Sequence, residues 1–310
     1  MTINQMLVDE ASAYINVLVT SIEEKEDRNG NPYIIAEISD GENKVPVRMF
    51  GTSLDEAPFN VGDILDANII SSLYNGSMTF KMSDFTVVTD EDGINVEDYV
   101  VSAPDSNDEM DADINGLIGH IVDVPLRELT QSLYKEYEQQ LIYYPAAKSH
   151  HHNYYGGLKY HSLCVAKNAY ALAETYKFAN RDLCIAGALL HDIGKIFEYD
   201  SSMFGDAEYN VDGNLFGHLF IGAEIVKNKA KEMNVSSEII RNLVHIILSH
   251  HDNPEWGAVK MPTTIEARIV ASADFVDSQI EAMRQATDVI EPGTTTMGYV
   301  CGVKPYKAKL

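Results

Sequence analysis

Imidazole and carboxylate side chains stand inside apolar stretches of this 310-residue chain. The clearest case is the adjacent pair His191 and Asp192, because every other residue from Leu183 to Ile193 is apolar or glycine. Such a helix is normally buried, and ionisable groups are costly there unless they are paired or bind a metal. For a lone pair, a core histidine bonded to its neighbour is the commoner explanation. The alternative is a metal site, since neutral imidazole and carboxylate both bind first-row divalent ions.

Four further apolar segments carry candidate ligands, and they decide between the two interpretations. The spacing of the apolar residues predicts a separate helix for each segment. In chain order the candidates are His161, His191 and Asp192, His218, His250 and His251, and Asp274. An ordered set of imidazoles and carboxylates on separate helices predicts a metal site.

Five segments hold these residues together with their neighbours. They are PAAKSHHHNYYGGLKYHS (145–162), AGALLHDIGK (186–195), NLFGHLFIGAEIV (214–226), LSHH (248–251) and ADFVD (273–277). The segments resemble the HD-domain metal-dependent phosphohydrolases. The first of them points to the YhaM-type 3′-5′ exoribonucleases, in which an OB fold precedes the HD domain.

The resemblance implies two divalent ions with Asp192 between them. By this analogy one ion is bound by His161, His191, Asp192 and Asp274, and the second by Asp192, His218 and His250, with His251 as a further ligand or outer contact. Two such ions can clamp the attacking and leaving oxygens of an in-line displacement. The ligand set suits Mn²⁺, Fe, Co²⁺ or another first-row ion, and we expect Mn²⁺.

Two residues are expected to be catalytic, Asp192 and Lys195. Lys195 lies three residues after Asp192, on the same helix face, where its charge would meet a phosphate oxygen. The alternative is an ordinary surface lysine. By resemblance, His151 and His152 would face the substrate.

The implied activity is metal-dependent 3′-5′ hydrolysis of phosphodiester bonds in single-stranded RNA, with release of nucleoside monophosphates, and DNA is a further candidate substrate. A small-nucleotide phosphohydrolase is the alternative enzyme: a dNTPase, or a phosphodiesterase for cyclic or alarmone nucleotides. A third class is a non-catalytic binding scaffold, which the intact ligand order disfavours. The resemblance also suggests a homo-oligomer.

The residues before the metal-site segments predict a small β domain. Short β-rich runs separated by turn signals predict strands at 13–23, 33–38, 44–50, 63–73 and 77–88. Asn75-Gly76 is a strong hairpin signal. Five strands with a break after the third match an OB-type barrel.

OB barrels bind single strands by stacking bases on exposed aromatic side chains. By position the candidates are Tyr33, Arg48, Tyr74, Phe80 and Lys81, of which Tyr33 and Arg48 are the expected substrate contacts. The alternative is that most of these aromatics form the barrel core.

The sequence therefore predicts a multidomain α+β protein, a five-stranded OB-type barrel followed by an all-α HD domain. The expected divisions are an OB-fold-like domain at 1–95, an acidic linker at 96–113, the helical HD domain at 114–290 and a tail at 291–310.

Net charge is −24, and the residues up to Asp113 hold 24 acidic and five basic side chains. This acidity argues against tight nucleic-acid binding by the barrel, because phosphate neutralisation normally supplies much of the affinity. No apolar run approaches the ~20 residues needed to span a bilayer, and no secretory signal opens the chain. We expect a cytoplasmic protein without membrane contact.

Overall fold

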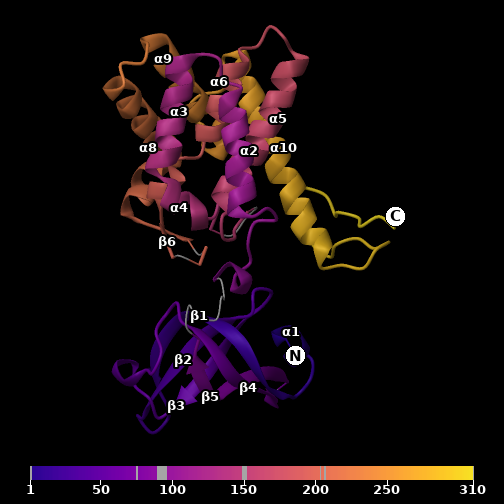
Figure 1. Cartoon of the computed structure of the whole chain (residues 1–310). Helices are drawn as coiled ribbons and strands as arrows, with labels where there is room; N and C mark the ends of the chain where they lie inside the picture. The colour runs from indigo at the N-terminus through magenta and orange to yellow at the C-terminus, as the bar shows by residue number, and fades with distance from the viewer. Residues whose placement is uncertain are drawn as a thin grey trace. The chain divides into compact units, whose positions relative to one another are not determined.

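The computed structural model describes residues 2–74, 76–88, 96–148, 152–202, 204–205 and 207–309. The chain divides into two compact units, Met1–Ser102 and Ala103–Leu310 (Figure 1). The division falls inside the stretch 96–113 for which the sequence predicted a linker. Helix α2 begins at Asn107, so the second half of that stretch is helical.

The N-terminal unit is a closed barrel with the strand order β1-β2-β3-β5-β4. Its strands are β1 (Ser12–Glu26), β2 (Pro32–Ser39), β3 (Lys44–Phe50), β4 (Ile64–Tyr74) and β5 (Ser77–Val87). Neighbouring strands are antiparallel except β3 and β5, which pair in parallel because β4 returns to β1 and closes the barrel. This is the topology of an OB barrel. The predicted fold of the N-terminal unit is confirmed.

Alternation along the strands sets the barrel interior. In β2, Ile34, Ala36 and Ile38 point inward and are buried, while the residues between them are partly exposed. Successive side chains of a strand face opposite sides of the sheet, so this pattern fixes which face forms the core. The described residues of this unit also form the short helices α1 (Ile3–Met6), η1 (Leu54–Glu56) and η3 (Val96–Tyr99).

The C-terminal unit is mainly helical (Figure 1). Its helices are α2 (Asn107–Gly119), α3 (Val124–Glu136), α4 (Glu138–Tyr143), α5 (Gly157–Thr175), α6 (Arg181–Leu190), α7 (Lys195–Glu198), α8 (Val211–Glu232), α9 (Ser237–Ser249), η4 (Pro254–Trp256) and α10 (Ile265–Asp288). Side chains that accept a backbone N–H start several of them, as Asn180, Ser236 and Thr264 do for α6, α9 and α10. The all-α expectation needs one correction: β6 (Tyr199–Ser201) and β7 (Ala207–Tyr209) form a short antiparallel hairpin between α7 and α8.

Helix α6 forms the centre of this unit. All residues from Leu183 to Leu190 are buried, as expected for a helix that is apolar on every side. It packs against α3, α5, α9 and α10. The chain leaves α6 at His191 and Asp192, so this pair emerges in the interior of the unit, among the other helices that carry candidate ligands.

Close backbone packing at Gly194 joins α7 to α8. A Cβ atom at Gly194 would lie 2.1 Å from the carbonyl oxygen of His218 and 2.6 Å from the amide nitrogen of Gly222. Gly194 has an ordinary helical φ of −63°, so only the lack of a side chain is required there.

We expect Gly194→Ala to lower the free energy of unfolding of the helical unit by about 1–3 kcal/mol, because the backbone of α8 must move to admit the methyl group. The control is Gly116→Ala within α2, where a Cβ meets nothing within 4 Å. That change should stabilise the helix by about 0.5–1 kcal/mol. Urea unfolding followed by circular dichroism measures both, and equal effects of the two substitutions would contradict the packing argument.

Candidate metal centre

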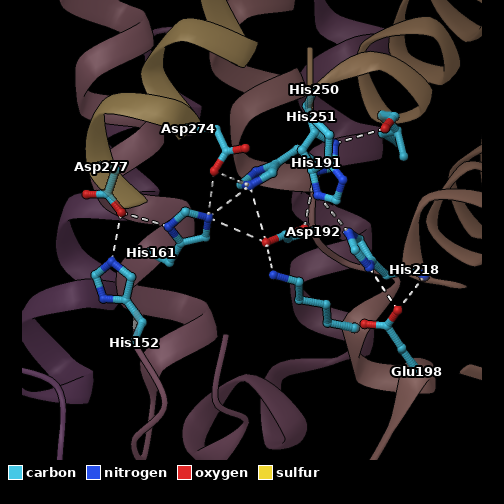
Figure 2. Close-up of polar contacts among 12 residues, drawn as sticks. His152, His161, His191, Asp192, Glu198, His218, His250, His251, Asp274 and Asp277 are labelled. Carbon is cyan, nitrogen blue, oxygen red and sulfur yellow. Dashed lines mark hydrogen bonds and ion pairs between the residues drawn. The ribbon is translucent and has the colours of Figure 1, made fainter. Parts of the chain in front are cut away.

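All seven predicted ligand positions converge in the interior of the helical unit (Figure 2). They come from five places in the chain: His161 on α5, His191 and Asp192 after α6, His218 on α8, His250 and His251 after α9, and Asp274 on α10. Asp192 lies between the others, and both its side chain and that of His191 are buried.

One half of the site surrounds Oδ2 of Asp192. The Nε2 atom of His161 lies 3.4 Å from this oxygen, 3.1 Å from Nε2 of His191 and 3.3 Å from Oδ1 of Asp274. Nε2 of His191 is also 3.4 Å from Oδ2 of Asp192. Nε2 of His191 and Oδ1 of Asp274 are 4.0 Å apart. Ligand atoms that bind one ion at about 2.0–2.2 Å lie roughly 3–4 Å apart, so the four side chains fit a single first-row ion.

The other half surrounds Oδ1 of Asp192. Nε2 of His250 and Nε2 of His218 lie 3.4 Å and 3.5 Å from this oxygen, and Nε2 of His251 lies 3.3 Å from that of His218. Among the described residues, Oδ1 of Asp192 and Nε2 of His250 have no hydrogen-bond partner although both are buried. Unsatisfied buried polar atoms are costly, and a cation between them would remove that cost.

Backbone carbonyls orient three of the histidine rings. Nδ1 of each ring is bonded to a carbonyl oxygen: His191 to Ala188 at 2.7 Å, His250 to Ile247 at 2.9 Å and His251 to Trp256 at 3.0 Å. A carbonyl only accepts, so Nδ1 must carry the proton and donate it. Nε2 of each neutral ring then presents a lone pair to the centre, which is the tautomer that a metal ligand requires.

Carboxylates orient the remaining two rings. Nδ1 of His161 lies 2.7 Å from Oδ2 of Asp277, and Nδ1 of His218 lies 2.9 Å from Oε1 of Glu198. Glu198 also accepts the backbone N–H of His218 at 2.9 Å. That N–H is available because Gly217, with φ 71°, interrupts α8 immediately before the histidine. Sequence reasoning missed both carboxylates.

Opposing effects set the charge of the Asp192 carboxyl. Burial would raise its pKa, but the nearby charges of Lys195 and His191, together with hydrogen bonds from histidines, hold the pKa of Asp192 well below its usual range. The pKa of Asp274 is also lowered, because hydrogen bonding to His161 and nearby histidine charges outweigh burial. Both carboxyl groups are therefore anionic ligands at neutral pH.

The pKa shifts of the imidazoles differ between the two halves of the site. Burial lowers the pKa of His250 and, with the neighbouring histidines, lowers the pKa of His251 to about 3. These rings stay neutral, as ligands must. Burial would likewise lower the pKa of His161, but hydrogen bonds to Asp192, Asp274 and Asp277 raise it well above its usual value. The negative charge that favours a proton there equally favours a divalent cation.

Lys195 is buried at the centre. Its Nζ lies 2.7 Å from Oδ2 of Asp192, and this contact raises the pKa of the amine although burial opposes it. The alternative of a surface lysine is therefore wrong. Lys195 also lines a cavity of about 380 Å³ over the centre, together with Asp192, His218, His250, His251 and Asp274.

The expectation that His152 faces the substrate needs correction. His152 is 1% exposed, and its Nε2 lies 2.8 Å from the Asp277 oxygen that also contacts His161 (Figure 2). Its Nδ1 lies 2.7 Å from the hydroxyl of Tyr154. His152 adopts φ 55°, which turns the chain so that the ring lies behind His161. His151 lies outside the described residues.

Two predicted substrate contacts lie on one outer face of the barrel. Tyr33 stacks on Phe50 with ring centroids 5.2 Å apart and planes 27° apart. Arg48 is exposed on the same face of β3, two residues before Phe50, and is the register partner of Lys81 on β5.

The other two aromatic candidates of the barrel differ in exposure. Tyr74 is exposed at the end of β4, whereas Phe80 is only 4% exposed and lies in the barrel core. Phe80 and Lys81 are adjacent in β5, so they cannot both face outward. For Phe80 the alternative interpretation, a place in the barrel core, is confirmed.

Comparison with known proteins identifies the family. A family model described as HD domain matches residues 158–278. The chain is 32% identical to the 3′-5′ exoribonuclease YhaM of Halalkalibacterium halodurans, over 86% of this chain and 82% of that protein. This chain belongs to the YhaM family. YhaM proteins of Listeria welshimeri and Bacillus subtilis are 31% and 30% identical over 86% of the chain, with 84% and 85% of those proteins covered.

The family assignment confirms the predicted resemblance. The HD domain and the histidine and aspartate clusters together support a divalent metal cofactor. A mitochondrial single-stranded DNA-binding protein of S. cerevisiae, Rim1, matches 26% of this chain and 98% of its own at 15% identity. Its TM-score of 0.21 is too low to bear on the fold. Within the part of the chain that the structure describes, no helix has the length and apolarity that a membrane crossing requires.

We expect Asp277→Asn to weaken metal affinity by about 10- to 100-fold, because the carboxylate that orients His161 loses its charge. The matched control is Glu174→Gln, a partly exposed acid on the same helix as His161 that pairs with Lys177 and Arg181. Calorimetric titration of the metal-free chain with Mn²⁺ measures both variants. Unchanged affinity in Asp277→Asn would show that this carboxylate does not support the site.

Proposed function

We propose that the chain is a metal-dependent 3′-5′ exonuclease that hydrolyses single-stranded RNA to nucleoside monophosphates at the centre around Asp192. The observation that carries the proposal is that the two oxygens of the Asp192 carboxylate face different sets of candidate ligands. Membership in a family of 3′-5′ exoribonucleases supplies the reaction and its direction. DNA is a further candidate substrate.

Two divalent ions are proposed, with Mn²⁺ as the first candidate. One set of ligands is His161, His191, Asp192 and Asp274, and the other is Asp192, His218, His250 and His251. When bound, such a pair supplies an activated water and stabilises the attacking and leaving oxygens of an in-line displacement.

The chain's own residues orient the proposed ligands and place a positive charge beside them. Carbonyl and carboxylate partners on Nδ1 keep the histidine rings in one tautomer. Lys195 is buried beside Asp192 at the cavity wall, so its ammonium group can move from that carboxylate to a phosphate oxygen as negative charge develops.

Cavity charge makes phosphate binding depend on the metal. Asp192, Asp252 and Asp274 line the cavity, and Lys195 is the only cation among the described residues that line it. A phosphodiester brings further negative charge, so the protein side chains alone repel it. Two divalent ions reverse the sign of the field and couple substrate binding to metal loading.

One face of the barrel favours a polymeric substrate over a free nucleotide. Tyr33 and Phe50 offer stacked rings beside Arg48 and Lys81 on one face, an arrangement suited to bases and phosphates of a single strand. The acidity of the N-terminal region favours the second candidate, a small-nucleotide phosphohydrolase, because that enzyme needs no phosphate-binding barrel. We propose Tyr33 and Arg48 as substrate contacts outside the catalytic centre.

Removing the central carboxylate tests the reaction. We expect Asp192→Asn to abolish Mn²⁺-dependent shortening of 5′-labelled unstructured RNA, with a loss of at least about 10³-fold, since both ions lose a shared ligand. Asp200→Asn, an exposed acid on β6, is the control and should retain full activity.

The same assay separates the candidate functions. Blocking the 3′ end should stop the wild-type chain, and the released products should be monomers. Hydrolysis of free nucleotides with no shortening of RNA would contradict the exonuclease assignment and favour the small-nucleotide enzyme.

Replacement of the stacked tyrosine tests the barrel. We expect Tyr33→Ala to raise KM for a long unstructured RNA by about 5- to 150-fold, the equivalent of 1–3 kcal/mol for one stacked base. The value of kcat should stay unchanged, because the barrel holds no metal ligand. Tyr14→Ala is the control: Tyr14 is exposed on the barrel too, but its hydroxyl bonds to Asp84 in an acidic environment. An unchanged KM in Tyr33→Ala would exclude this face as the RNA-binding surface.

A further inference from the structure

Two exposed aromatic rings lie in the wall of the cavity over the metal centre. Trp256 is 57% exposed and Phe275 is 48% exposed. Their ring centroids are 6.0 Å apart and their planes differ by only 9°. Neither ring is needed to hold an ion. Adjacent aromatic rings in the wall of a cavity are a common feature of sites that bind small molecules.

Each ring is tied directly to a metal-ligand candidate. Phe275 follows Asp274 on α10, so its position is fixed by the helix that carries the carboxylate. The carbonyl oxygen of Trp256 accepts the Nδ1–H of His251 at 3.0 Å. Trp256 ends the short helix η4, whose start is capped by the side chain of Asn253. The backbone at both positions is therefore anchored beside the metal-ligand candidates.

The face of α10 explains how the cavity wall is built. Ala271, Asp274, Phe275 and Ser278 all line the cavity, and their spacing of three, four and seven residues places them on one side of a helix. Along this face an acidic ligand is followed by an aromatic ring. The wall thus has a charged end at the metal centre and an apolar end at Phe275 and Trp256.

This division matches the two ends of a nucleotide. A phosphate requires the metal end, and a base requires a flat apolar surface. The cavity volume of about 380 Å³ lies near the lower limit for small-molecule pockets, which favours one nucleotide over a longer segment. Stacking is tolerant of sequence because every base has a π face, as an enzyme that removes successive nucleotides requires.

We propose that Trp256 and Phe275 form a stacking platform for the base of the 3′-terminal nucleotide, while its phosphodiester lies at the metal centre. This inference rests on the proposed exonuclease function and adds the subsite that binds the departing nucleotide. The platform holds the base by stacking, so it positions the terminal nucleotide without reading its identity.

Binding of a mononucleotide tests the platform independently of turnover. The chain contains one tryptophan, so fluorescence excited at wavelengths that tyrosine does not absorb reports on Trp256 alone. Titration of the Mn²⁺-loaded chain with AMP should quench this emission, and ribose 5-phosphate, which lacks the base, should not. Quenching by both compounds, or by neither, would overturn the stacking assignment.

Kinetics on two RNA substrates provide the second test. The substrates share one sequence, but one ends in an abasic nucleotide at its 3′ end. We expect the wild-type chain to prefer the base-containing end by about 5- to 150-fold in kcat/KM for removal of the first nucleotide, the equivalent of one stacking interaction. Trp256→Leu should abolish most of this preference and leave cleavage of the abasic end within about twofold.

Two controls separate stacking from damage to the centre. Phe178→Leu removes an aromatic ring that is 73% exposed and lies outside the cavity, and it should keep the full preference. Metal content of Trp256→Leu should equal that of the wild type, because the His251 partner is a backbone carbonyl. Equal losses on both substrates, or a retained preference in Trp256→Leu, would refute the platform. Absence of RNA cleavage by the wild-type chain would instead refute the proposed function, and the AMP titration would still decide on stacking.

Discussion

A buried carboxylate with its two oxygens turned toward different partners is the constraint on which the helical unit depends. Asp192 is almost inaccessible to solvent, and an unpaired charge in such a place is strongly destabilising. Lys195 compensates one oxygen directly. The other oxygen has no hydrogen-bond partner among the described residues. The helices that surround α6 bring imidazole rings and a second carboxylate, Asp274, to this point, where a divalent cation would satisfy the buried charge. Their packing cannot be separated from the chemistry at that point.

The orienting partners extend this constraint outward. Three rings are held by carbonyls in their own or adjacent turns, which come with the backbone. The other two depend on Asp277 and Glu198, which are brought in by other elements. Asp277 also contacts His152, so one carboxylate oxygen on α10 joins two histidines that both lie more than a hundred residues before it in the chain. Three histidines are thus oriented by contacts local in the sequence, and the other two by carboxylates that reach them only in the folded unit.

Sequence reasoning found the residues that converge around Asp192 because each was a polar residue in an apolar run. His191 and Asp192 illustrate this, since nothing else from Leu183 to Ile193 is polar. The barrel was predictable for a related reason: turn residues and alternation mark its strands. Both signals are local in the sequence. The position of Lys195 beside Asp192 is local too, because the two residues are one helical turn apart.

What the sequence did not reveal was set by tertiary packing. Glu198 looks like an ordinary helix residue, and only the break of α8 at Gly217 brings the N–H and the ring of His218 to it. His152 sits in a histidine run that suggests an exposed tract, but its positive φ turns the ring inward. Phe80 belongs to the barrel core, as the alternative interpretation of the aromatics expected, and its neighbour Lys81 is exposed.

The placement of Asp274 and Asp277 on α10 has a consequence for biosynthesis. Every other ligand candidate precedes this helix in the chain, and domains fold as units during translation. The barrel is complete by Ser102 and can fold early. Until α10 has emerged from the ribosome, the histidines around Asp192 lack the carboxylates of that helix. Maturation of the centre is therefore a late event, timed by the emergence of a single helix from the ribosome.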